Sequence, residues 1–283
     1  MDSTRVASVS FLNAAPLNEG LAGVQGLALD TVVPSRIGGM LERGEADIGL
    51  VSMIDVLRAT EPLTLIPAGG IGCDGPTLTV RLYTAVEPSK ITTLHADTDS
   101  HTSVALAQVL LNELHGVTPK VIDFDARERT PSAENADPAE AWPESVLLIG
   151  DKVVTDSPPA VRYPHQIDLG ELWHEHTGLP FLYACWACRT ADRESPAVRT
   201  AAVLLDRTRR RNTMRLDWLV ARYAEQRGWP GDLARRYVGE LLRYEVDDRA
   251  RQGAELYAEK VAALGLAPAK PLDWLAPAAA ASF

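Results

Sequence analysis

The amino-acid sequence predicts an α/β protein of two lobes around a cleft, followed by a helical C-terminal segment. Strand and helix signals alternate in two successive units, one before and one after Pro88. From Ser195 onward the apolar residues recur at helical spacing instead. The 283 residues suffice for two lobes of ordinary size that bury a substantial core without disulfides.

The first unit carries the signals of a β-α-β arrangement. Side-chain character alternates along residues 5–11, which predicts a strand. Ser35 is expected to cap a helix that Gly44 ends, and the apolar run 47–51 resumes as a strand. Glycines between 69 and 75 predict a tight loop. The remaining elements predicted before Pro88 are strands at 26–33, 63–67 and 77–84 and a short helix at 54–58.

The second unit repeats this order and leads into the helical segment. A polar stretch at 97–103 precedes an apolar helix at 104–114, which Gly116 closes. The stretch 129–144 is rich in Pro, Ala and Glu, and it is predicted as a loop or short helix. Strands are predicted at 91–95, 121–124 and 146–149, and C-terminal helices at 201–207, 214–228, 232–244 and 252–264.

Charge and hydropathy exclude several classes of partner. Lys and Arg total 28 against 38 Asp and Glu, so the net charge of −10 argues against a nucleic-acid partner. Apolar runs such as 146–149 are far shorter than the roughly 20 residues of a membrane helix, so no membrane association is expected. Residues 1–8 lack the features of a secretory signal, and the chain has three cysteines, which together predict a reduced, cytoplasmic protein.

Polar residues mark the places where ligands bind in open α/β sheets, beyond the carboxyl ends of strands. Asn13, Ser52 and Asp151 follow predicted strands. The hydroxyls of 100–103 lie beside the free amides of a helix start, which suits a carboxylate or phosphate, although a plain N-cap explains them too. Asn13 likewise fits either a turn or an amide that contacts a small ligand.

The CxxC pair formed by Cys185 and Cys188 has two interpretations. With His174 and His176 it offers four zinc ligands, but there is no second CxxC and the following residues indicate a loop rather than the helix of a redox motif. Small buried side chains are the favoured alternative, and no metal is predicted. The arginines at 207–215 are interpreted as a solvated helix face. No P-loop, GxGxxG, HExxH or Ser-His-Asp order is present.

Six motifs occur in a fixed order: SFLNAAPL at 10–17, EADIGLVS at 45–52, DGPTLTVRL at 74–82, SHTSVAL at 100–106, LIGD at 148–151 and DLGELWHEHTGLPF at 168–181. Together they resemble the menaquinone-biosynthesis chorismate dehydratases of the futalosine pathway. The resemblance spans about residues 6–186 and continues more weakly through 237–266.

This resemblance implies a type II periplasmic-binding-protein-like fold with mixed sheets, used by an enzyme that needs no metal or organic cofactor. Residues 1–88 and 187–283 would form the first lobe, residues 89–186 the second, and the active site would lie in the cleft between them. The implied partner is a small-molecule substrate, chorismate.

The resemblance also assigns site residues. Asn13 would be the catalytic position, and the residues lining the cleft or holding a substrate carboxylate would be Ser52, Gly75, Thr79, Ser100, Thr102 and Ser103. The chain departs from the family at His101, where Arg is common, and at Arg81, where an aliphatic residue is usual. Because residues i and i+2 of a strand share a face, Arg81 could point into the cleft with Thr79 and bind a carboxylate that a neutral His101 would not hold. Pairing with a surface carboxylate is the alternative for Arg81.

The expected reaction is the dehydration of chorismate to 3-[(1-carboxyvinyl)oxy]benzoate. The alternatives are the related naphthoate-forming enzyme of the same pathway and a solute-binding protein that performs no chemistry. The cleft positions assigned above are neutral, so a carboxylate of the substrate is predicted to remove the ring proton. Asp151 is the competing base, although it could instead bond nearby backbone amides.

Overall fold

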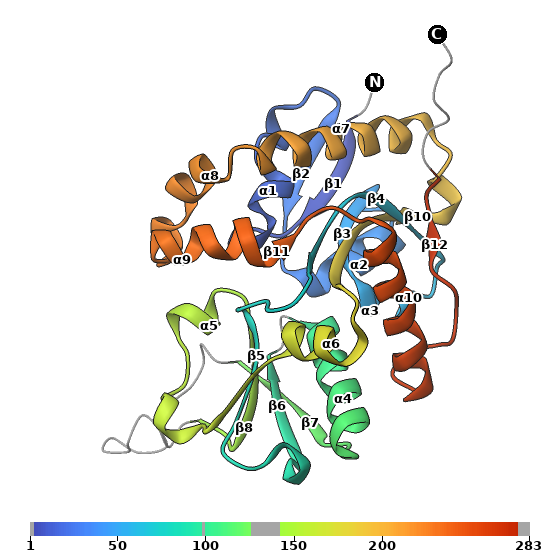
Figure 1. Ribbon diagram of the computed structural model, residues 1–283. Helices are drawn as coiled ribbons and strands as arrows, with labels where there is room; N and C mark the ends of the chain where they lie inside the picture. Colours follow the sequence, from blue (N-terminus) through green and yellow to red (C-terminus); the bar gives the residue numbers. More distant parts are fainter. Residues whose placement is uncertain (1–2, 98–99, 126–141, 277–283) are drawn as a thin grey trace.

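The computed structural model describes residues 3–97, 100–125 and 142–276. Two sheets, each flanked by helices, form two lobes one above the other (Figure 1). Most of the predicted loop at 129–144 lies outside the described residues. The α/β fold class, the two mixed sheets and the helical C-terminal segment are confirmed.

The first lobe contains a mixed sheet in the order β11-β4-β10-β3-β1-β2, with β12 also paired to β4. β1 is parallel to β2 and β3, whereas β10 is antiparallel to β3 and β4. The strands are β1 (Thr4–Ser8), β2 (Leu27–Thr31), β3 (Ile48–Ser52), β4 (Leu63–Cys73), β10 (Phe181–Arg189), β11 (Leu242–Arg243) and β12 (Asp273–Trp274). The helices are α1 (Ala15–Asn18), α2 (Pro34–Glu42), α3 (Met53–Arg58), α7 (Pro196–Thr213), α8 (Leu216–Tyr223), α9 (Gly231–Arg236) and α10 (Asp248–Ala263).

The second lobe is built on the same plan. Its sheet has the order β7-β6-β8-β5-β9, in which β6 is parallel to both neighbours and β5 is antiparallel to both of its neighbours. The strands are β5 (Val80–Thr84), β6 (Thr93–Asp97), β7 (Lys120–Phe124), β8 (Ser145–Ile149) and β9 (His165–Asp168). The helices are α4 (His101–His115), α5 (Lys152–Thr155) and α6 (Leu169–Thr177).

The sheets divide the chain at positions that differ from the predicted lobe limits. β5 belongs to the second sheet, so the first crossing between lobes lies before residue 80 rather than at 88. β10 belongs to the first sheet from Phe181 onward, so the return crossing comes before residue 181 rather than at 186. The antiparallel strands β5 and β10 each join the sheet of the lobe that the chain has just entered. The alternation of strands and helices in the sequence does not show to which sheet such a strand belongs.

Glycines in β4 allow a close approach of strands rather than a loop. β4 runs through Gly70 and Gly72 to Cys73, six residues beyond the predicted end at 67. A Cβ on Gly70 would lie 2.7 Å from the Ala184 carbonyl oxygen, and one on Gly72 would lie 2.6 Å from the Phe181 carbonyl oxygen. The glycines are therefore needed where β4 meets the irregular register of β10.

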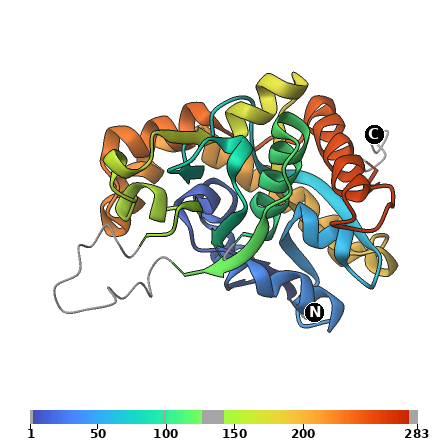
Figure 2. The ribbon, with the colours of Figure 1, turned by 90° about the horizontal axis from the view of Figure 1, so that it is seen from below.

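The hydrophobic core is continuous between the lobes. Trp173 of α6 packs edge-on against Phe181 of β10 at 5.1 Å, and Phe181 packs against Tyr257 of α10 at 5.1 Å between ring centroids. The Tyr257 hydroxyl donates to the Thr102 carbonyl oxygen at 3.2 Å. Seen from below, α10 lies beside α4 (Figure 2). Helices of both lobes thus share buried contacts behind the cleft.

Gly170 allows the two crossing segments to pack together. A Cβ at this position would lie 2.0 Å from Oγ1 of Thr77 and 2.8 Å from the Gly75 carbonyl oxygen. We therefore expect Gly170→Ala to reduce the free energy of unfolding by about 2–3 kcal/mol, measured by denaturant unfolding. Gly231→Ala is the matched control, because a Cβ there has nothing within 4 Å. An equal loss in both variants would contradict the close-packing argument.

Within residues 3–97, 100–125 and 142–276, no helix combines the length and the apolar character that crossing a membrane requires.

Candidate active site

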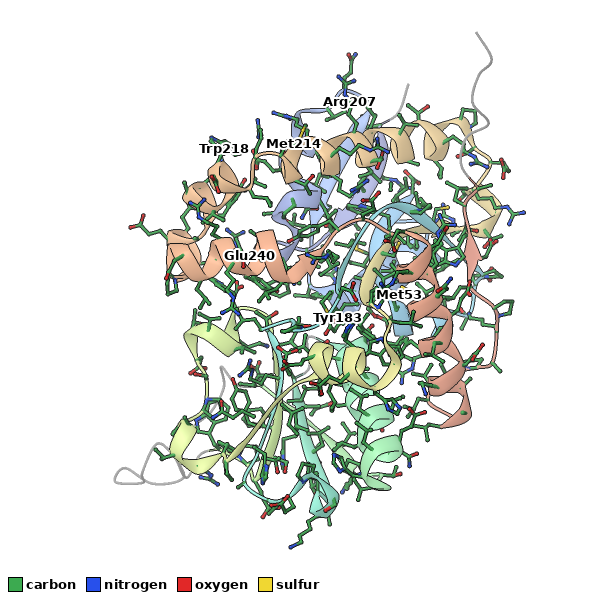
Figure 3. The ribbon with its side chains drawn as sticks, viewed as in Figure 1. Met53, Tyr183, Arg207, Met214, Trp218 and Glu240 are labelled. Carbon is green, nitrogen blue, oxygen red and sulfur yellow. The ribbon has the colours of Figure 1, made fainter. Side chains whose placement is uncertain are left out.

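A cavity that is partly open to solvent contains residues of both lobes in its walls. Figure 3 shows Tyr183 of β10, one of these residues, at the level where the lobes meet. The cavity is lined by Val9, Phe11, Asn13, Pro34, Ser35, Leu50, Ser52, Asp55, Ile71, Thr77, Thr79, Val80, Ser100, His101, Thr102, Ser103, Ile149, Gly150, Tyr183, Ala184, Tyr237 and Leu242. A wall that combines apolar side chains with hydroxyl, amide, imidazole and carboxylate groups suits a small polar organic ligand.

The cavity brings together most of the site residues that the sequence suggested. Six of them line it: Asn13, Ser52, Thr79, Ser100, Thr102 and Ser103. They come from the turn that follows β1, the end of β3, the bend before β5 and the start of α4. Gly75, Arg81 and Asp151 do not line it.

Asn13, Thr79 and Tyr237 form a polar group on the cavity wall. The Tyr237 hydroxyl and Oγ1 of Thr79 are 2.7 Å apart in a buried hydrogen bond. Burial raises the pKa of the Tyr237 phenol well above its usual value, although hydrogen bonds with Thr79 and Asn13 act in the opposite direction. The phenol therefore keeps its proton at neutral pH. Oδ1 of Asn13 is buried and has no hydrogen-bond partner among the described residues, so it is an acceptor available to a ligand in the cavity.

The sequence interpretation did not include Tyr237 among the site residues. It lies in the predicted helix at 232–244, but α9 ends at Arg236 and a π-helical turn follows from Tyr237 to Leu241. The Tyr237 ring stacks on Trp229 at 4.9 Å and 9°. A widened turn of this kind occurs often at functional sites, but helical periodicity alone does not indicate it.

Ser52, Asp55 and His101 form a second polar group that joins the lobes. Oγ of Ser52 donates to Oδ2 of Asp55 at 2.7 Å, and Nδ1 of His101 lies 2.8 Å from Oδ1 of the same carboxylate. This hydrogen bond raises the pKa of the His101 imidazole above its usual value and outweighs the opposing effect of burial. Asp55, which lies 46 positions earlier, thus favours the imidazolium, and this partner was not part of the expectation that His101 is mostly neutral.

The start of α4 presents hydroxyls and backbone amides to the cavity. Oγ of Ser100 caps the helix by accepting from the Ser103 amide at 3.3 Å, and Oγ1 of Thr102 accepts from the Ile54 amide at 3.2 Å. The residues thus cap the helix and also line the cavity, and the carboxylate contact stays a prediction. With His101 beside them, they form a positively polarised end of the cavity that suits a carboxylate.

Arg81 lies away from the cavity. Its Nη2 is 3.8 Å from Oδ2 of Asp168, the neighbouring strand's residue in register with it. The same-face argument fails because Thr79 lies in a bend before β5 begins at Val80, so strand alternation does not link Thr79 to Arg81. The structure thus places Arg81 beside a carboxylate of its own chain, as the alternative interpretation expected, but this carboxylate is buried rather than on the surface.

Asp151 and Gly75 are not part of the cavity lining. Oδ1 of Asp151 accepts from the Trp229 indole at 2.8 Å, and Trp229 stacks on Tyr237. Gly75 has φ +119°, in the segment that leads from β4 to β5. Asp151 thus supports the aromatic pair next to the site.

The cysteines and histidines of the CxxC region do not form a metal site. Cys185 and Cys188 lie in β10, and burial raises the pKa of both thiols to about 12. Nδ1 of His174 is 2.9 Å from Asp74, and Nε2 of His176 is 2.8 Å from Glu113. Among the described residues, no three His, Cys, Asp or Glu side chains are grouped to hold a metal ion.

Comparisons with known proteins agree with this architecture. A curated chorismate dehydratase of Thermus thermophilus is 29% identical over 270 residues, which cover 90% of this chain and 93% of that protein. A solved structure of an Archaeoglobus fulgidus protein gives a TM-score of 0.67 at 15% identity, over 93% of this chain and 97% of that chain. The periplasmic aliphatic sulphonate binding protein of Escherichia coli gives 0.62 at 13% identity, over 96% of each chain.

The structural neighbours establish a periplasmic-binding-protein-like fold, with the cavity between its two lobes. The family model described as menaquinone biosynthesis matches residues 4–263. Since this match covers nearly the whole chain, the protein belongs to the menaquinone-biosynthesis family.

Proposed function

We propose that the protein dehydrates chorismate to 3-[(1-carboxyvinyl)oxy]benzoate in the cavity between the lobes. The observation that carries the proposal is the pairing, in one cavity, of the free amide oxygen of Asn13 with the carboxylate-binding end formed by α4 and His101. Chorismate carries two carboxylates and a ring hydroxyl, so it matches both ends. The 29% identity to a chorismate dehydratase supports the same reaction.

The chemistry requires orientation more than it requires a strong acid or base. Loss of the ring hydroxyl and of the proton on the carbon that bears the enolpyruvyl ether makes the ring aromatic, so the reaction is strongly downhill. The hydroxyls and amides at the start of α4 hold one carboxylate, and Asn13 contacts the reacting edge of the ring. The apolar side chains of the wall lower the local dielectric and strengthen these contacts.

The titratable residues of the cavity wall are poorly suited to act as the base. Burial raises the pKa of the Tyr183 and Tyr237 phenols, so both stay protonated. Asp55 already accepts from Ser52 and pairs with His101, whose raised pKa favours the charged form. A carboxylate of chorismate is therefore the group that takes the ring proton, since intramolecular placement gives effective molarities of ~10⁵ M or more.

The direct test is to incubate the protein with chorismate and follow the ultraviolet spectrum. The dehydratase is supported if the benzoate chromophore appears and mass spectrometry shows a product that is lighter than chorismate by one water molecule. A thermal shift with chorismate but no turnover would instead indicate a binding protein. If the protein shows no thermal shift and no turnover with chorismate, chorismate is not its ligand. That result would favour the related naphthoate-forming activity.

Asp151→Asn tests whether the substrate or the protein supplies the base. Asp151 bonds the Trp229 indole and does not line the cavity, and an amide oxygen can still accept that bond. We therefore expect kcat for chorismate to stay within about threefold of the unmodified protein. A folded variant that binds chorismate but has lost turnover would identify Asp151 as the base and overturn the substrate-base proposal.

A further inference from the structure

Leu78 has an unusual backbone conformation next to the cavity. Its φ is 71°, and among the described residues it is the one non-glycine residue in the left-handed region. Leucine rarely adopts this conformation, because its Cβ crowds the backbone. Leu78 lies between Thr77 and Thr79, and both threonines line the cavity. Something in the surroundings must therefore hold the segment in place.

The Asp168 carboxylate supplies that restraint. Oδ2 accepts from the Leu78 amide at 2.6 Å, and Oδ1 accepts from the Thr77 amide at 2.9 Å. Oδ1 also accepts from the Gly170 amide at 3.0 Å and the Glu171 amide at 3.2 Å, which caps α6. Asp168 is 5% exposed and does not line the cavity.

Asp168 connects the two segments that cross between the lobes. The first crossing contains Thr77 and Leu78, and the return crossing begins with α6, whose start Asp168 caps. The Thr77 hydroxyl is 2.7 Å from the Tyr183 hydroxyl of β10, and the Thr79 hydroxyl is 2.7 Å from that of Tyr237. The orientation of the Leu78 peptide thus decides where both threonine hydroxyls point.

We propose that Asp168 is a positioning residue for the site: it holds Leu78 in the left-handed conformation and thereby fixes Thr77 and Thr79 against Tyr183 and Tyr237. This inference rests on the proposed function only in the experiments that measure turnover of chorismate. The carboxylate acts through the backbone amides of the 77–79 segment and makes no contact with the ligand.

Asp168→Asn is a selective test because the two carboxylate oxygens have different partners. The amide oxygen of asparagine is expected to occupy the Oδ1 position, where three N–H groups converge. The amide nitrogen would then face the Leu78 N–H, donor against donor, so the hydrogen bond from Leu78 is lost together with the longer ion pair to Arg81 at 3.8 Å. We expect kcat for chorismate to fall roughly tenfold, with a smaller change in KM.

Leu78→Gly in the Asp168→Asn background separates positioning from stability. Glycine adopts positive φ without steric cost, so the double variant is expected to recover kcat to within about threefold of Leu78→Gly alone. Asp247→Asn is the matched control, because Asp247 caps α10 by accepting from the Ala250 amide at 2.8 Å. Because asparagine caps a helix about as well as aspartate, this variant should leave both thermal stability and kcat nearly unchanged. Unchanged kcat in Asp168→Asn, or no recovery in the double variant, would overturn the proposal.

Amide hydrogen exchange of the peptide that spans 74–80 tests the restraint without any substrate. Asp168→Asn should increase exchange there, whereas Asp247→Asn should not. If the unmodified protein fails to dehydrate chorismate, the proposed function fails, but the exchange measurement still decides the restraint. Equal exchange in the unmodified protein and Asp168→Asn would show that Asp168 does not hold the segment.

Discussion

Asn13→Ala is expected to lower kcat for chorismate dehydration by roughly 100-fold or more, the usual effect of removing one well-placed polar group from a site shielded from water. Oδ1 of Asn13 is buried and lacks a partner among the described residues, while the Asn13 side chain also hydrogen-bonds with the Tyr237 phenol. Its amide can therefore orient the departing hydroxyl or the enolpyruvyl group. Steady-state kinetics should show the loss in kcat, with the affinity for chorismate changed much less.

The control for this variant must also lie on the cavity wall. Ser35 lines the cavity at the start of α2 but has no assigned role in the reaction. Ser35→Ala should therefore keep kcat within about threefold of the unmodified protein. Near-normal turnover in Asn13→Ala would make the residue a turn former that follows β1, and the catalytic assignment would be wrong.

Much of the fold could be predicted because local patterns dominate it. The alternation at 5–11 and the apolar run at 47–51 correspond to β1 and β3, and the helix predicted at 104–114 corresponds to α4. Predictions failed where a tertiary contact overrides the local signal. The glycines of β4 indicate a turn in sequence, but the approach of β10 requires them within a strand. Similarly, β11 forms by pairing with β4 where periodicity predicts helix.

The site was predictable in its capping residues and not in its side-chain pairs. Ser52 and Ser100 stand at helix starts, and such positions can be recognised from sequence. The Asp55–His101 pair joins α3 to α4 across the lobes, and the Thr79–Tyr237 bond spans 158 positions. No spacing rule anticipates such contacts. The sequence does not predict the positive φ of Leu78 either, because leucine rarely adopts this conformation.

The second large effect is expected at His101, and it depends on pH. Nδ1 of His101 pairs with Asp55, while the cavity-lining position of the residue leaves the other side of the ring to a substrate carboxylate. The charged groups around the imidazole are Asp55 and Arg58 of α3 and Asp123 of β7. Asp55 raises its pKa most strongly, Asp123 also raises it, and Arg58 and burial lower it.

The sign of the pH dependence follows from this raised pKa. In the folded protein the imidazolium persists above pH 6.5, the ordinary value, and it is lost as the pH rises through the raised pKa. The carboxylates of chorismate stay ionised throughout. Affinity should therefore be highest on the acid side and weaken as the pH rises, and any contribution of the Asp55–His101 pair to folding stability should fade over the same interval.

His101→Gln removes the titration and keeps a neutral donor. We expect its affinity for chorismate to be roughly tenfold weaker at about pH 6 and nearly independent of pH, the scale of one charge-assisted hydrogen bond. Titration calorimetry in the Asn13→Ala background, where turnover is slow, measures Kd without consuming the ligand.

Arg81→Leu is the matched control, because Arg81 pairs with Asp168 outside the cavity. Its Kd should keep the value and pH dependence of the parent. A pH-dependent Kd in His101→Gln would assign the titration to another group, and a weaker Kd in Arg81→Leu would return the carboxylate contact to Arg81.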